Sequence, residues 1–426
     1  MLYFYAWQCI ILFPSERNMG PLVVLAYSGG LDTSAIVPWL KETYDARVLC
    51  FAANVGQGAG ELEGLEEKAV RSGAVGCVVE DVRERLVRDF IFPTLQAGAV
   101  YSREYLLGTA MARPVIAEAQ VATARRANAQ ILAHGCTGKG NDQVRFEFTY
   151  ACLAPDLQII APWREWEFKG REDLRRYLAE RGIPVEATAE KPYSRDRNLW
   201  HCSHEGGVLE DPETAPPADL FLMSTDPVDA PNDPLELTVE FEVGVPVSVD
   251  GAPLGPVQLI EHLNEVAGAH GIGRADVVED RMIGMKSRGV YETPGGTVLR
   301  AAHRNLEQIV LDRRTLGLKD QLAPRYADLV YEGRWWTKER EVLDALVAAT
   351  QQQVTGEVRL RLFKGSVTVL SRRSPYSLYS AKHATFEADD VFEHADAGAF
   401  IRLYGLQDRI ASERRSVEKP RRMALL

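Results

Sequence analysis

Apolar runs and amphipathic segments alternate between residues 22 and 162 of the chain. Short apolar runs are typical of buried strands, and longer segments with apolar residues every three or four positions are typical of helices that cover a sheet. The alternation therefore predicts an α/β fold with a doubly wound parallel sheet. The expected strands are residues 22–27, 47–53, 77–80, 130–133 and 157–161, and the expected helices are residues 33–43, 61–71, 82–96, 114–127, 146–153 and 172–181.

The pattern changes after Gly182 and Pro184, which form a normal stop signal for a helix. Residues 211–234 carry six prolines and read as an extended crossing segment. Beyond it, the pattern predicts a half-exposed strand at 235–243, helices at 257–267 and 297–313, and a hairpin at 358–370 that turns at Lys364 and Gly365. Together these elements predict a second domain of the α+β class.

The length of 426 residues is enough for two or three domains, and we expect two domains and a tail. Met19 stands directly before the first expected strand, so we interpret residues 1–18 as an upstream start-site extension. This segment lacks a basic n-region and a cleavage site, and its apolar stretch is too short to span a bilayer. The expected boundaries are 1–18, 19–185 for the first domain, 186–380 for the second, and 381–426 for a helical C-terminal arm.

Charge and cysteine content narrow the choice of partners and compartment. Lys and Arg total 49 against 60 Asp and Glu, and a formal charge of -11 disfavours nucleic acid unless the basic residues gather on one face. The six cysteines form neither a CxxC pair nor a disulfide framework, which is typical of a reducing compartment. We therefore expect a cytoplasmic protein that binds neither membranes nor nucleic acid.

Residues 28–34 read SGGLDTS and lie between the first expected strand and the first expected helix. In such a turn, the backbone N–H groups of the loop and of the helix N-terminus point at one place and form a cradle for an anion. The Walker form is excluded, because the lysine is missing and an aspartate lies inside the turn. The motif resembles that of the pyrophosphatase-loop ATP enzymes, which implies adenylylation of a substrate with release of pyrophosphate.

Two more glycine-rich loops follow expected strands, at residues 54–58 and 134–143. Ligands of doubly wound sheets bind beyond the carboxyl ends of the strands, so the three loops should meet at one edge. The last loop adds side-chain donors and acceptors at Thr137, Lys139, Asn141 and Asp142.

Other clusters invite different interpretations. His201, Cys202, His204 and Glu205 suggest a metal site, but their spacing matches no zinc pattern, and a strand with alternate side chains facing a pocket and the solvent is the ordinary alternative. His134 and Cys136 suggest a ligand pair or a nucleophile, against a simple loop. Trp335 and Trp336 suggest base stacking, against core packing.

Six separated segments resemble the argininosuccinate synthase family over nearly the whole chain from Met19. They are residues 26–34, 134–147, 161–171, 203–212, 264–274 and 283–294. The resemblance implies a C–N ligase of arginine biosynthesis that joins citrulline and aspartate while ATP becomes AMP and pyrophosphate. It also implies that residues 186–380 form a synthetase and multimerisation domain, that residues 381–426 form an oligomerisation arm, and that four copies form a homotetramer.

The same resemblance implies the residues of the site. Asp32, Asp142 and Arg145 are the expected catalytic residues; Mg²⁺ arrives with ATP, and Asp32 is the candidate to contact it. No side-chain general base is obligatory: the aspartate amine can lose its proton to the leaving phosphate or to a nearby carboxylate, and Asp142 is our hypothesis for that carboxylate. ATP contacts fall on Ala26, Tyr27, Ser28, Gly29, Gly30, Leu31, Asp32, Thr33, Ser34, Ala53 and Gly135; aspartate contacts fall on Thr137, Asn141 and Asp142; citrulline contacts fall on Tyr105, Thr109, Asn141, Arg145, Ser194, Ser203, Glu279 and Tyr291.

Three positions depart from expectation. Ala110 stands where the family often has serine, Cys136 stands where alanine is usual, and Pro38 should kink the first helix.

Two other functions compete with the ligase: a different pyrophosphatase-loop enzyme such as a tRNA thiolase, which needs a reactive cysteine or a basic RNA surface, and an ATP-binding regulatory module without turnover. A pyrophosphate-release assay with citrulline and aspartate separates the three.

Overall fold

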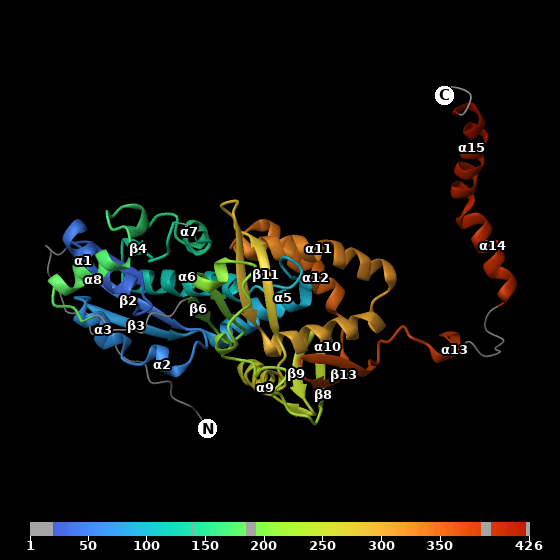
Figure 1. Cartoon of the computed structure of the whole chain (residues 1–426), viewed down its shortest axis with the longest axis horizontal. Coiled ribbons are helices and arrows are strands. Elements are labelled where there is room, and N and C mark those ends of the chain that lie inside the picture. Colours follow the sequence, from blue (N-terminus) through green and yellow to red (C-terminus); the bar gives the residue numbers. More distant parts are fainter. Residues whose placement is uncertain (1–19, 139, 185–192, 385–392, 423–426) are drawn as a thin grey trace. The chain divides into compact units, whose positions relative to one another are not determined.

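The computed structural model describes residues 20–138, 140–184, 193–384 and 393–422 (Figure 1). Four expected features lie outside the described residues: the proposed extension 1–18, Met19, Lys139 and the domain boundary at 185 and 186. The chain forms two compact units, Met1–Tyr376 and Ser377–Leu426. The first unit contains every residue expected in the site, so it is described first.

A parallel five-stranded sheet lies at the start of the first unit. Its strands are β1 (Leu22–Ala26), β2 (Arg47–Asn54), β3 (Gly76–Asp81), β4 (Ile131–Ala133) and β5 (Gln158–Ile160), in the order β3-β2-β1-β4-β5. All four pairings are parallel, as the sequence predicts. The strand order reverses between β1 and β4, and this is the point where doubly wound sheets bind their ligands.

Helices cover both faces of this sheet, which explains why its strands are apolar at nearly every position. In β1, Val23 and Leu25 pack with α1 (Leu31–Tyr44) and α8 (Arg171–Glu180). Val24 points to the other face and packs with α6 (Gly108–Arg126). The remaining elements here are α2 (Ala59–Leu62), α3 (Leu65–Arg71), α4 (Arg83–Arg85), the π-helix η1 (Leu86–Ile91), α5 (Phe92–Ala97), α7 (Asp142–Leu153) and the 3₁₀ turn η2 (Pro162–Arg164).

In the described residues after β5, the first unit contains two antiparallel sheets and four long helices (Figure 1). One sheet has the order β10-β9-β8-β13-β14 and packs against α10, and the other has the order β11-β12-β7-β6. Their strands are β6 (Ser194–Arg197), β7 (Cys202–Glu205), β8 (Leu235–Glu242), β9 (Val245–Val249), β10 (Ala252–Pro253), β11 (Arg274–Asp280), β12 (Lys286–Glu292), β13 (Gly356–Phe363) and β14 (Ser366–Arg373). The helices are the 3₁₀ turns η3 (Gly207–Glu210) and η4 (Ala218–Leu220), then α9 (Pro256–Ala269), α10 (Pro294–Val310), α11 (Arg313–Tyr331) and α12 (Lys338–Gln351).

Several predicted elements differ in their bounds for local reasons. The helix expected at 61–71 is split, because Gly64 adopts a φ of 71° between α2 and α3. The helix expected at 114–127 begins at Gly108 and keeps the buried Pro114 in its interior. The helix expected at 297–313 ends at Val310, because the Asp312 side chain caps the next helix by accepting from the N–H groups of Arg314 and Thr315. The predicted hairpin turn at Lys364 and Gly365 is confirmed.

The second unit is helical, with α13 (Ala381–Ala384), α14 (His394–Tyr404) and α15 (Leu406–Arg422). In α14 the side chains of Phe400, Ile401, Leu403 and Tyr404 are exposed although they are apolar. Within the described ranges, no helix is both long enough and apolar enough to cross a bilayer.

Candidate active site

The loop between β1 and α1 is a turn whose geometry requires glycine. Gly29 has a φ of 71°, and a Cβ placed on it would lie 2.4 Å from Leu65 Cδ2. The Ser28 hydroxyl lies 3.2 Å from Thr33 Oγ1 and accepts from the Gly30 N–H, so the turn is tied to the first turn of α1. No described side chain caps α1, whose first N–H groups are left for an external anion.

The loop after β4 lies directly against this turn. A Cβ on Gly135 would lie 3.0 Å from Thr33 Cγ2 and 3.2 Å from Ile36 Cδ1, so the residue must be small. His134 bonds Glu147 across 2.9 Å through Nε2, and its Nδ1 accepts from the Cys136 N–H. His134 therefore shapes the loop, as the interpretation without a metal predicts.

The third loop, after β2, borders a cavity of about 850 Å³. Asn54, Gly56 and Gly58 line it from the parallel sheet, while Asn198 and Asn264 line it from the other part of the unit. Ala53 is buried beside this loop. The three loops therefore follow β2, β1 and β4, which are neighbours in the sheet, and this confirms that they share one edge.

Asp32 lies in the first turn of α1. Burial raises the pKa of its carboxyl, and Arg171 partly offsets this increase. A half-buried carboxylate next to free helix N–H groups is a chemically suitable ligand for a hard cation that accompanies phosphates.

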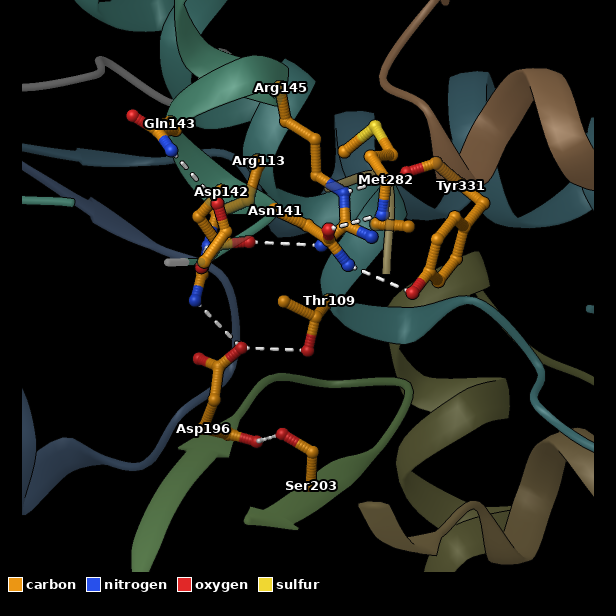
Figure 2. Close-up of polar contacts among 12 residues, drawn as sticks. Thr109, Arg113, Asn141, Asp142, Gln143, Arg145, Asp196, Ser203, Met282 and Tyr331 are labelled. Carbon is orange, nitrogen blue, oxygen red and sulfur yellow. Dashed lines mark hydrogen bonds and ion pairs between the residues drawn. The ribbon is translucent and has the colours of Figure 1, made fainter. Parts of the chain in front are cut away.

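Four charged side chains, two arginines and two aspartates, form a connected cluster (Figure 2). Arg113 on α6 donates through Nε to Asp142 Oδ2 at 2.9 Å and through Nη2 to Asp196 Oδ2 at 2.8 Å. Arg145 donates through Nη1 to Asp142 Oδ1 at 2.9 Å. Burial raises the pKa of Asp142, but the two guanidinium groups outweigh it and hold that pKa below its ordinary value.

A second chain of hydrogen bonds leads from Asn141, next to this cluster, to the C-terminal end of α11 and to β11. Asn141 donates to the Tyr331 hydroxyl at 2.8 Å (Figure 2). The Tyr331 hydroxyl donates in turn to Glu279 Oε1 at 2.8 Å. The Tyr291 hydroxyl donates to Glu279 Oε2 at 3.1 Å. Burial raises the pKa of Glu279, although the two tyrosines and Arg145 act in the opposite direction.

Arg145 is almost completely buried, and its position is fixed from three sides. Its Nε donates to the Tyr331 carbonyl at 2.9 Å, its Nη1 bonds Asp142, and its guanidinium lies 5.0 Å from the centre of the Tyr331 ring. Guanidinium geometry fixed in this way is suited to a carboxylate of a ligand.

Aromatic rings form a wall of the same region. Tyr105 and Tyr291 stack with ring centres 4.3 Å apart, and His201 stacks on Tyr291 at 6.0 Å. The Tyr105 hydroxyl accepts from the N–H groups of Thr109 and Ala110. Ala110 has no side-chain hydroxyl to contribute, and its backbone N–H is used in this way.

The remaining expected residues differ in how far they enter the cluster. Ser203 on β7 donates weakly to the Asp196 carbonyl at 3.4 Å, so it faces the cluster. Thr137 is exposed on the loop after β4. Ser194 is exposed on the edge strand β6, opposite Glu205. These two residues lie at the rim. Ser28 and Gly30 in the loop after β1 are also exposed, while the other expected residues are at least partly buried.

The histidine, cysteine and glutamate cluster on β7 is structural. Residues 202–205 form a strand, as the ordinary interpretation predicts, but Cys202 and His204 face a buried layer instead of solvent. Cys202, His204 and Glu292 offer ligand atoms within 4.8 Å of one another. However, Glu292 already accepts hydrogen bonds from His204 and from the backbone of residues 222–224.

The alternatives that need a reactive thiol or an exposed tryptophan are not supported. Burial raises the pKa of the Cys136 thiol, and Asp142 raises it further. Trp335 is buried and stacks on Phe90 with ring centres 4.4 Å apart, which confirms core packing. The described cysteines are Cys50, Cys77, Cys136, Cys152 and Cys202, and all are free thiols.

Sequence reasoning missed three residues that hold the cluster together: Arg113, Asp196 and Tyr331. A local signal existed for Arg113, because it is a lone charge within the apolar helical run 110–117. Asp196 and Tyr331 gave no such signal. Their roles depend on contacts with residues 87 and 190 positions away in the chain.

Comparisons of the sequence with known proteins show which family the chain belongs to. Residues 22–184 match the sequence model of the arginosuccinate synthase N-terminal HUP domain, and residues 193–411 match that of the arginosuccinate synthase C-terminal domain. The chain is 57% identical over 389 residues to the argininosuccinate synthase of Roseiflexus sp. (strain RS-1), covering 91% of this chain and 95% of that one. It is 56% identical to the chloroplastic argininosuccinate synthase of Arabidopsis thaliana, covering 91% of this chain and 78% of that one.

Among solved structures, a U34-tRNA thiolase from Methanococcus maripaludis overlaps 42% of this chain and 62% of its own, with 14% identity and a TM-score of 0.26. An overlap this weak supports no argument about function. The two family models together cover most of the chain, and several relatives exceed half identity over about nine-tenths of it. The chain therefore belongs to the argininosuccinate synthase family.

Proposed function

We propose that the chain joins L-citrulline to L-aspartate while ATP becomes AMP and pyrophosphate, with the site residues acting as follows. Membership of the argininosuccinate synthase family is the observation that carries this function. The ureido oxygen of citrulline attacks the α-phosphorus of ATP, and the bond to the β-phosphate breaks. The aspartate amine then attacks the ureido carbon, and AMP leaves as the C–N bond forms.

The turn at Ser28, Gly29 and Gly30 would hold the departing pyrophosphate. Support comes from the free N–H groups of α1 and from the packing of Gly135 against Thr33, which brings the β4 loop to the same place. Mg²⁺ bound with ATP would neutralise charge on the phosphates. Asp32 is the proposed contact for that ion, directly or through water.

The polar cluster would bind the two amino acids. Arg145 is the proposed partner of a substrate carboxylate, because two of its nitrogens are already fixed by Tyr331 and Asp142. The rest of the proposed citrulline set is Tyr105, Thr109, Asn141, Ser194, Ser203, Glu279 and Tyr291. The proposed aspartate set is Thr137, Asn141 and Asp142. Asp142 would hold a proton only transiently, since Arg113 and Arg145 keep its pKa low.

The domain limits 19–185 and 186–380, and a homotetramer held by the arm 381–426, are also proposed. The exposed apolar side chains of α14 support the arm, because such a stripe is normally covered by another surface. The pattern of free cysteines supports a cytoplasmic location.

The test of this function is ATP conversion with each amino acid omitted in turn. We expect AMP and argininosuccinate only when ATP, citrulline and aspartate are all present, measured by chromatography of the products. Pyrophosphate exchange into ATP should need citrulline but not aspartate. AMP formation that ignores citrulline would contradict the proposal.

Replacement of Gly289 by alanine should weaken citrulline binding specifically. A Cβ on Gly289 would lie 2.4 Å from the Tyr291 hydroxyl oxygen, so the ring must leave Glu279. We expect the KM for citrulline to rise about tenfold, the effect of one lost hydrogen bond to a charged group, with the KM for ATP unchanged. Gly317→Ala in α11 is the control, because its Cβ meets nothing within 4 Å; an equal effect there would refute the explanation.

A further inference from the structure

The Thr109 hydroxyl has one proton, and the hydrogen bonds around it show where that proton goes. Its Oγ1 lies 2.8 Å from Asp196 Oδ2 and 2.9 Å from His201 Nε2 (Figure 2 draws the first contact). A carboxylate can only accept, so the Thr109 proton points at Asp196. His201 must then donate to Thr109 through Nε2–H, which fixes the tautomer of the ring.

This arrangement makes Thr109 Oγ1 an acceptor toward any further ligand. The hydroxyl has already given its proton to Asp196, and one lone pair is used by His201. Burial lowers the pKa of His201 to about 4, so the ring stays neutral and keeps this pattern near neutral pH. A group that reaches Thr109 must therefore bring its own N–H or O–H.

Asp196 is likewise a hydrogen-bond acceptor toward a further ligand. Its Oδ2 accepts from both Thr109 and Arg113, while its side chain is 29% exposed and can receive another donor. The surrounding charges favour a cation. The acidic groups here are Asp142, Asp196, Glu205 and Glu279, and the basic groups are Arg113, Arg145 and Arg281. With all of them ionised, four negative charges stand against three positive charges, which leaves one negative charge to be neutralised.

We propose that Asp196 and Thr109 bind the α-ammonium group of citrulline, with Arg113 and His201 as the residues that position them. This inference rests on the proposed function and assigns a substrate contact to Asp196. It follows from two acceptors placed side by side with fixed polarity in a cluster that has an excess of negative charge.

The chemistry of the reaction decides which of the two amino acids supplies the ammonium. A nearby carboxylate stabilises the charged form of an amine and raises its pKa. The aspartate amine must lose its proton before it can attack, so this position would hinder it. The α-amine of citrulline takes no part in the reaction, and holding it as a cation costs nothing in rate.

The experiment compares citrulline with 5-ureidopentanoate, which is citrulline without its α-amino group. In Asp196→Asn, the amide oxygen can still accept from Thr109 and Arg113, but the amide N–H₂ replaces the free carboxylate oxygen. We expect the wild-type chain to bind citrulline about tenfold to hundredfold more tightly than 5-ureidopentanoate, by calorimetry in the presence of ATP analogue. In Asp196→Asn the two ligands should bind about equally, and the KM for aspartate should not change.

Asp276→Asn is the matched control, because Asp276 pairs with Arg288 outside the cluster and should leave the affinity ratio unchanged. If Asp196→Asn fails to fold, the same two ligands are compared in Thr109→Val and Thr109→Ser. We expect Thr109→Val to lose the preference for citrulline over 5-ureidopentanoate and Thr109→Ser to keep it. His201→Gln, which keeps a donor at the Nε2 position, should retain citrulline affinity better than His201→Asn. An affinity ratio that stays the same in Asp196→Asn, or a rise in the KM for aspartate in place of citrulline, would overturn the assignment even if the ligase reaction is confirmed.

Discussion

Replacement of Gly29 by alanine is expected to lower kcat/KM for ATP at least about a hundredfold. Two effects combine at this position. The φ of 71° costs an L-residue about 1–2 kcal/mol, and the new Cβ would lie 2.4 Å from the buried Leu65 Cδ2. The turn, the Leu65 side chain or both must therefore shift, and a shift of the turn would move the N–H groups that we propose hold the phosphates.

The size of the effect follows from the geometry of phosphoryl transfer. A displacement of about 1 Å in a positioned reactant can cost a factor of about a hundred in rate. Citrulline binding depends on residues from other elements and should change little. The measurement is citrulline-dependent pyrophosphate release over a range of ATP concentrations, with citrulline affinity measured separately.

Gly182→Ala provides the matched control for backbone strain. Gly182 has a φ of 65°, close to that of Gly29, but a Cβ there meets nothing within 4 Å. The two variants should lose similar stability from the left-handed backbone, while only Gly29→Ala loses activity. A comparable loss of activity in both would show that general destabilisation, rather than the phosphate turn, explains the result.

Replacement of Arg113 by methionine is expected to have the second large effect, on both stability and catalysis. The side chain links Asp142 on α7 to Asp196 on β6, and it is only 17% exposed. Removal leaves two carboxylates close together without their shared cation. We expect the free energy of unfolding to fall by about 3 kcal/mol, the lower end of the range for breaking a buried pair, and kcat/KM for citrulline to fall about a hundredfold.

The loss of stability should depend on pH in a definite direction. The folded-state pKa of Asp142 is below its unfolded value, so its stabilising effect is fully present above the unfolded pKa and is lost as pH falls through the folded one. The difference between wild type and Arg113→Met should therefore be large near neutral pH and shrink in acid. Urea unfolding at a series of pH values measures this difference.

Arg181→Met is the control for Arg113→Met. Arg181 bonds both oxygens of Glu42, with side chains that are 29% and 49% exposed, so its loss should cost at most about 1 kcal/mol. Its loss should also leave kcat/KM for citrulline unchanged. If Arg113→Met were no more damaging than this surface variant, the bridge would have no organising role.

The parallel sheet was predictable because its strands are buried on both faces. Continuous apolar runs such as residues 22–27, each followed by a helix, have few other solutions. The antiparallel sheet β11-β12-β7-β6 was not predicted. Its strands carry charged residues at many positions, and their partners lie far away in sequence, as in the pairing of Tyr291 with Ser203.

The site divides in the same way. The glycine-rich loops can be recognised from the sequence alone. A turn with a positive φ and close packing requires glycine at fixed positions, as at Gly29. The residues that tie the cluster together depend on tertiary contacts. Nothing near Tyr331 in the sequence shows that its hydroxyl lies between Asn141 and Glu279.

The hydrogen bond from Asn141 to Tyr331 spans 190 positions of the chain. The Asn141 side chain cannot meet this partner until the chain as far as α11 has been made, so in synthesis from the N-terminus this polar contact is among the late ones to form. A chain that ends before α11 would leave both Asn141 and Glu279 without the Tyr331 hydroxyl.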